Sequence, residues 1–83
     1  MKNNKIFTVV VVEDEKLIAK NIAKNIELVN SNFKVISIEN NGEDALNFIK
    51  QNTPNVIFTD IQMPVMDGIE LIRQIFQYNN YIK

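Results

Sequence analysis

The stretch IFTVVVVEDE, residues 6–15, decides the fold class because a continuous apolar run ends abruptly in three acids. Residues 6–12 are mostly β-branched, which is typical of a strand covered on both faces in a parallel sheet. From Lys16 to Val29 the apolar residues recur at helical spacing. A buried strand followed at once by an amphipathic helix predicts an α/β domain.

The predicted helix has one apolar face, which we expect to lie on the sheet. Its members are Ile18, Ile22, Ile26 and Val29, with Ala19 and Ala23 beside them. Lysines take the opposite side.

The same alternation continues along the chain. We predict strands at 33–38 and 56–59, helices at 43–51 and 69–77, a turn at 39–42 and a loop at 60–68. Asp67 is placed to cap the last helix. Right-handed crossovers give a parallel sheet. If the chain reverses direction after the second strand, the sheet has order 2-1-3, with the first helix on one face and the other two on the opposite face.

Composition limits the possible functions. The chain has 83 residues, which fits one small domain, and a net charge of −1, so direct contact with nucleic acid by this segment is not expected. The absence of cysteine excludes disulfides and thiolate metal sites and is compatible with the cytoplasm, and histidine is absent too. The apolar run at 6–12 is too short to cross a membrane and lacks a cleavage site for a signal peptide.

Two groups of acids follow strands that must be neighbours. Glu13 and Asp14 follow the first strand and Asp60 follows the third, beside the crevice where open α/β sheets bind ligands. Three close carboxylates repel one another, and a hard divalent cation held by oxygen ligands, such as Mg²⁺, removes that repulsion. Such a site suits phosphoryl transfer, with an aspartate oxygen as nucleophile.

Each motif also has a simpler interpretation when taken alone. The acids at 13–15 are also typical of a helix N-terminus, Asp67-Gly68 of a turn and cap, and Met63-Pro64 of a loop. The combination of acids at two adjacent strand ends favours the metal site.

Four segments resemble one family. VVVVEDE and TDIQMPVMDGIEL, with ENNGEDAL and TPNVIFTDI between them, closely resemble the receiver domain of bacterial two-component response regulators. The resemblance covers essentially the whole chain and implies a flavodoxin-like three-layer fold.

The resemblance also implies roles for individual residues. Asp60 is the expected phosphoacceptor, taking a phosphoryl group from the phosphohistidine of a sensor histidine kinase or from a small donor. Mg²⁺ is the expected cofactor, bound by Asp14 directly, Glu13 through water, Asp60, and the main-chain carbonyl of Gln62. Met63-Pro64 and Asp67-Gly68 are expected to shape the loop and start the third helix.

Residues 1–83 match only part of that family, lacking its last two strand–helix units. The terminal NNYIK resembles the entry to a fourth strand, and Lys83 comes too early to be the lysine of the family's fifth strand. We therefore expect an exposed apolar patch beside the first helix and an open edge on the third strand. Self-association, a domain-swapped dimer, or membership of a longer regulator would relieve this exposure.

Two other functions remain open. The chain is also compatible with an interaction module that uses the receiver fold without phosphorylation. A Mg²⁺-dependent phosphohydrolase ranks last, because its usual motif has a second acid two residues after the nucleophile, where this chain has Gln62. On the leading interpretation the domain is a substrate and switch and not a stand-alone enzyme.

Overall fold

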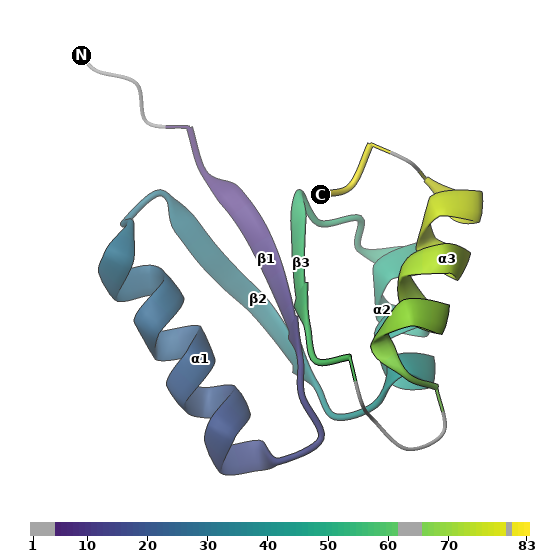
Figure 1. The fold of residues 1–83 in the computed structure, drawn as a ribbon. Coiled ribbons are helices and arrows are strands. Elements are labelled where there is room, and N and C mark those ends of the chain that lie inside the picture. Colours follow the sequence, from purple (N-terminus) through teal and green to yellow (C-terminus); the bar gives the residue numbers. More distant parts are fainter. Residues whose placement is uncertain (1–4, 62–65, 80) are drawn as a thin grey trace.

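Strands and helices alternate along the chain (Figure 1). The computed structural model describes residues 5–61, 66–79 and 81–83. The elements are β1 (Phe7–Val12), α1 (Lys16–Val29), β2 (Phe33–Glu39), α2 (Gly42–Gln51), β3 (Val56–Thr59) and α3 (Gly68–Tyr78). Each predicted boundary lies within one residue of the observed one.

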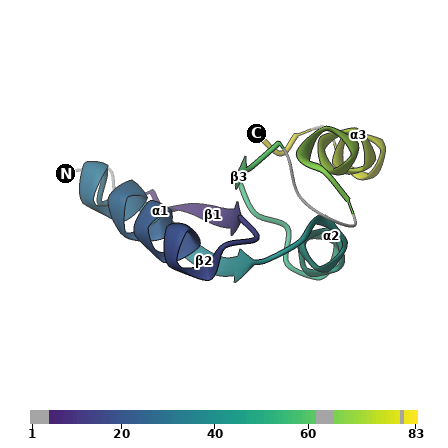
Figure 2. The ribbon, with the colours of Figure 1, turned by 60° about the horizontal axis from the view of Figure 1, so that its bottom comes forward.

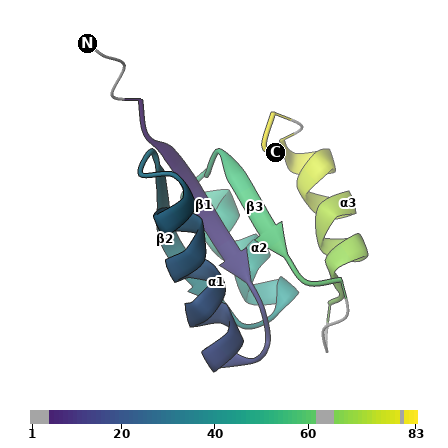
Figure 3. The same cartoon turned by 60° about the vertical axis from the view of Figure 1, so that its left-hand side comes forward.

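The three strands form one parallel sheet of order β2-β1-β3, as predicted (Figure 3). β1 lies in the centre and pairs along its length with β2. The register shifts between Val9, which pairs with Val35, and Val10, which pairs with Ser37. Ile36 is thus an extra residue in β2, and this irregularity leaves the carboxyl ends of β1 and β2 level, with Val12 opposite Glu39.

Side chains of β1 point alternately to two separate cores, because successive strand residues face opposite sides of a sheet. Val9 and Val11 pack with Ala19 of α1, whereas Val10 and Val12 pack with α2 and α3. All four valines are at most 1% exposed, and each contributes roughly 1.5–3 kcal/mol of burial free energy. Figure 2 shows α1 on one face of the sheet and α2 and α3 on the other, which is the predicted three-layer arrangement.

The predicted apolar face of α1 is only partly buried. Ala19 is fully buried, and Ile22, Ala23 and Ile26 pack against it and the sheet. Ile18 and Val29 were expected on the same face, but they are 43% and 84% exposed. The prediction was wrong at these two positions because α1 is the only described helix on its face of the sheet, so nothing described covers its flanks (Figure 2).

The outer edge of β3 is covered in part, which corrects the expectation of an open edge. The Lys83 N–H donates to the Asn55 carbonyl at 2.9 Å, and the Lys83 carbonyl accepts from the Ile57 N–H at 2.6 Å. These two bonds place Lys83 beside Val56 in a parallel arrangement, as the entry to a fourth strand would require. They also put Lys83 at the amino end of β3, whereas Asp60 follows its carboxyl end.

None of the helices in the described part of the chain is both long enough and apolar enough to span a bilayer.

Candidate functional site

Backbone hydrogen bonds bring the two acid groups to the same end of the sheet. The Asp60 N–H donates to the Val12 carbonyl at 3.0 Å. Asp60 therefore lies beside the carboxyl end of β1, which Glu13 directly follows. On the other side, the Glu13 N–H donates to the Glu39 carbonyl at 3.0 Å. Both residues are thereby held where the parallel strands end, at the edge where open α/β sheets place their ligands.

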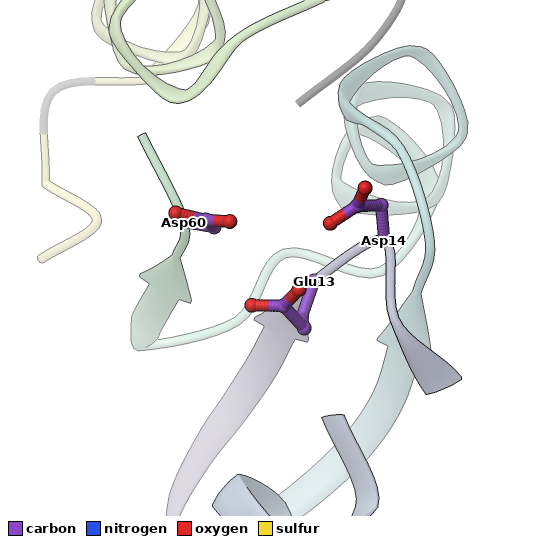
Figure 4. Close-up of side chains that lie close together, drawn as sticks. All are labelled: Glu13, Asp14 and Asp60. Carbon is purple, nitrogen blue, oxygen red and sulfur yellow. The ribbon is translucent and has the colours of Figure 1, made fainter. Parts of the chain in front are cut away.

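The three predicted acids lie together in the structure. One carboxylate oxygen from each of Glu13, Asp14 and Asp60 lies within 4.8 Å of the other two. Figure 4 shows the three carboxylates pointing toward one another, two from the end of β1 and one from the end of β3. Glu13 is buried, at 8% exposed, Asp60 is half-buried and Asp14 is exposed. The cluster is therefore open to solvent on the Asp14 side.

The closeness of the three carboxylates changes the pKa of Glu13. Its carboxylate accepts a hydrogen bond from the Glu15 N–H at 3.2 Å, which lowers its pKa. Burial, a hydrogen bond with Asp14, and the charges of Asp60 and Asp14 act in the opposite direction, and the net result is a raised pKa. At a separation of 4.8 Å, two carboxylates repel by about 3–4 kcal/mol at an effective dielectric near 20 and by about 1 kcal/mol in water.

The residue that follows Asp60 is hydrogen-bonded to the first residue of α3. The Gly68 N–H donates to the Ile61 carbonyl at 2.7 Å. A Cβ on Gly68 would lie 2.1 Å from the Asp60 carbonyl oxygen, so only glycine permits this approach. Asp67 caps α3 by accepting from the Glu70 N–H at 2.9 Å, as predicted. The helix start thus fixes the backbone at the candidate phosphoacceptor.

The other predicted loop residues cannot be placed. Gln62, Met63 and Pro64 lie outside the described residues. The expected main-chain ligand at Gln62 therefore stays a prediction.

The acids at 13–15 do immediately precede α1, as the helix N-terminus interpretation expected, but their geometry shows more than a helix start. Glu15 occupies the N-cap position of α1, but its side chain makes no capping hydrogen bond, and the first turn of α1 contains no acid. Glu13 and Asp14 turn instead toward Asp60.

Sequence reasoning missed the turn between β2 and α2 as part of the site. It was interpreted as a turn only, yet the Asn40 side-chain amide donates to the Glu13 carbonyl at 3.0 Å. Directly after this turn, at the first residue of α2, a Cβ on Gly42 would lie 2.6 Å from the Met66 carbonyl oxygen. The available signal was topological: β2 neighbours β1, so residues just after β2 must lie beside residues just after β1.

An α/β/α domain with three acids at the carboxyl ends of adjacent parallel strands belongs to the ligand-binding, doubly wound class. Residues 9–83 match the family described as the response regulator receiver domain. The chain belongs to this family, and its membership identifies it as a receiver domain of two-component signalling.

Individual relatives agree with this assignment. An uncharacterized response regulatory protein of Vibrio cholerae is 36% identical over 74 residues, which cover 89% of this chain and 28% of the relative. A protein-glutamate methylesterase/protein-glutamine glutaminase of Clostridium acetobutylicum is 43% identical over 67 residues, covering 81% of this chain and 19% of the relative. The chain thus spans less than a third of either relative.

Solved structures show the same fold. The signal receiver domain of the putative response regulator NarL from Mycobacterium tuberculosis superposes with a TM-score of 0.83 at 28% identity. The match covers 89% of this chain and 59% of that one.

Proposed function

We propose that the domain accepts a phosphoryl group on Asp60 in a Mg²⁺-dependent reaction, as the receiving step of a two-component phosphorelay. The observation that carries the proposal is the convergence of Glu13, Asp14 and Asp60 within 4.8 Å. The match to the receiver family over residues 9–83 supports the same role.

The donor set of the cluster suits Mg²⁺. All three side chains offer carboxylate oxygens, which hard cations prefer, and Asp14 is exposed so that solvent can complete the coordination. Bound there, Mg²⁺ would supply the positive charge that lets an anionic phosphoryl group approach three carboxylates. Asp14 and Asp60 are the proposed direct ligands, with Glu13 acting through water and the Gln62 carbonyl as a further ligand.

Asp60 is the proposed nucleophile. A carboxylate oxygen of Asp60 attacks phosphorus in line, and a P–O bond forms while the bond between phosphorus and the donor atom breaks. With a sensor histidine kinase as donor, the broken bond is the P–N bond of its phosphohistidine; with a small acyl phosphate it is a P–O bond. The product is an acyl phosphate on Asp60, so the domain is a substrate and switch and not a stand-alone enzyme.

The setting of the reaction is also proposed. The matched part of the chain corresponds to 59% of the solved receiver domain from NarL. The domain works in the cytoplasm with its kinase partner, and this segment, with a net charge of −1, makes no direct contact with nucleic acid.

Intact mass spectrometry tests the proposal. The protein is incubated with acetyl phosphate in Mg²⁺ or in a chelator. We expect Mg²⁺-dependent addition of one phosphoryl group in the wild type and in Glu15→Gln, a neighbouring acid outside the cluster, but none in Asp60→Asn. Folded protein that takes up no phosphoryl group would contradict the proposal and favour the non-phosphorylated interaction module. Continuous hydrolysis would favour the phosphohydrolase.

A second candidate function is self-association, with or without domain swapping. It is favoured by an open apolar cavity of about 430 Å³ between α1 and the sheet, lined by Ile26, Val29, Val56 and Phe58 among others. Val29 and Phe58 are 84% and 51% exposed. Soluble monomers seldom leave a large apolar surface uncovered.

Light scattering after size-exclusion chromatography tests self-association. We expect the wild type to form dimers as concentration rises. Val29→Glu should shift the protein to monomer, whereas Leu28→Glu, at a neighbouring position that is 71% exposed but does not line the cavity, should not. A wild type that stays monomeric at high concentration would exclude this candidate.

A further inference from the structure

Residues 39–42 run from the end of β2 through a short turn to the first residue of α2, and we call them the β2–α2 turn. They contact the backbone at two places near the acidic site, Glu13 and Met66. Glu39 accepts a hydrogen bond from the Glu13 N–H, and Asn40 donates one to the Glu13 carbonyl. Consecutive residues of the turn therefore hold Glu13 through both of its backbone polar groups.

The bond from Asn40 has a particular geometric consequence. The Glu13 carbonyl belongs to the peptide plane that joins Glu13 to Asp14. A donor fixed at 3.0 Å from that oxygen restricts the rotation of this plane, and with it the direction in which the Asp14 side chain leaves the backbone. The strand ladder cannot do this, because β1 ends at Val12.

The turn also contacts the segment that follows Asp60. Gly42 lies so close to Met66 that an added Cβ would be 2.6 Å from the Met66 carbonyl oxygen and 2.9 Å from its Cβ. One short turn thus contacts the backbone of Glu13 on one side and the end of the segment 60–68 on the other.

Asn40 is not needed to start α2. That helix is capped by Asn41, whose side chain accepts from the Asp44 N–H at 2.8 Å and donates to the Asp44 carboxylate at 3.0 Å. The two adjacent asparagines therefore have separate roles: Asn41 caps the helix, while the Asn40 amide is directed at β1.

We propose that Asn40 is a positioning residue for the acidic site, holding the Glu13–Asp14 peptide so that both carboxylates face Asp60. This inference rests on the proposed function for its Mg²⁺ readout. The backbone restraint itself does not depend on a bound ion.

The chain offers a matched control. Asn52 also donates its side-chain amide to a backbone carbonyl, that of Phe48 at 3.3 Å, but it lies at the opposite end of α2. Asn40→Ala and Asn52→Ala each remove one amide-to-carbonyl bond, with an expected loss of about 1 kcal/mol of stability in either case. Only Asn40→Ala should change the backbone mobility of Asp14 and the Mg²⁺ affinity of the acidic site.

Two measurements test the inference. The first is the ¹⁵N order parameter of the Asp14 amide without metal, which should fall from about 0.85 toward 0.6 in Asn40→Ala and stay unchanged in Asn52→Ala. The second is Mg²⁺ affinity by calorimetry, which should fall roughly tenfold in Asn40→Ala, as is usual when a group supporting a metal ligand is lost. Asn52→Ala should bind Mg²⁺ like the wild type.

The outcomes separate the inference from the proposed function. An unchanged Asp14 order parameter in Asn40→Ala, or equal loss of Mg²⁺ affinity in both variants, would overturn the positioning role. Wild-type protein that binds no Mg²⁺ would instead contradict the proposed function and the metal-dependent part of the inference, while the order parameter would still decide the backbone restraint.

Discussion

Replacing Asp60 by asparagine should stabilise the metal-free domain while abolishing its proposed reaction. The substitution preserves the size of the side chain and removes one of three charges whose oxygens lie within 4.8 Å. Asp60 then no longer repels Glu13 and Asp14. Each of these two repulsions is about 1 kcal/mol in water and about 3–4 kcal/mol at an effective dielectric near 20.

The lower end of that range applies, because Asp14 is exposed and Asp60 is only half-buried. We therefore expect a gain of about 2 kcal/mol in the free energy of unfolding. For a domain of this size, 1 kcal/mol corresponds to about 4–8 °C, so the melting temperature should rise by about 8–16 °C. Added salt should reduce the gain, since charges near solvent are screened.

The assay is urea and thermal denaturation followed by circular dichroism, in a chelator, near neutral pH and at low salt. Glu15→Gln is the control, because it removes a charge from an adjacent acid that lies outside the cluster; its effect should stay within about 0.5 kcal/mol. Mg²⁺ at about 100 times its dissociation constant should stabilise the wild type by about 2.7 kcal/mol and Asp60→Asn by less. Equal stability of Asp60→Asn and the wild type without metal would refute the reasoning.

Three further predictions concern the same end of the sheet. The pKa of Glu13 is raised in the folded state, so the native protein binds more protons and metal-free stability should fall as pH rises from the ordinary value of 4.5 through the raised pKa. The urea midpoint of the wild type minus that of Glu13→Gln should fall across this pH window. A difference that rises with pH would contradict the prediction. Gly68→Ala should cost about 1–3 kcal/mol or more in urea denaturation, since its Cβ would lie 2.1 Å from the Asp60 carbonyl oxygen. Unchanged stability of Gly68→Ala would mean that the fold does not require α3 to lie this close to the Asp60 backbone. Asp67→Ala should cost about 1 kcal/mol by loss of the α3 cap, whereas Asp67→Asn should cost little; equal losses in thermal melts would argue against the capping role.

Much of the fold could be predicted from the sequence because its signals are local. The run at Val9–Val12 has neighbours on both faces, and the apolar residues of each helix recur at helical spacing. The order β2-β1-β3 required the further assumption that the chain reverses direction after β2, and the structure confirms it; the handedness of the crossovers then places α1 on one face and α2 and α3 on the other. Exposure of Ile18 and Val29 could not be predicted from periodicity, because spacing shows which residues share a face but not how much of that face has a neighbour.

The position of the three acids could be predicted from the sequence, but the contacts that hold them could not. Glu13, Asp14 and Asp60 could be brought together by topology alone, since they follow the ends of adjacent parallel strands. The hydrogen bond from Asn40 depends on the rotamer of one side chain in a turn, and the closeness of Gly68 to Asp60 depends on how α3 docks. Neither feature has a signature in residue spacing, which is why both became visible only in three dimensions.

The most direct test of the account is whether one divalent cation binds between Glu13, Asp14 and Asp60. Mn²⁺ can replace Mg²⁺ at oxygen-ligand sites, and its unpaired electrons broaden nearby NMR signals. We predict that substoichiometric Mn²⁺ broadens the amide signals of these three residues first, that excess Mg²⁺ restores them, and that Asp60→Asn weakens the effect. Broadening that is centred elsewhere, or spread evenly over the exposed acids, would contradict the account.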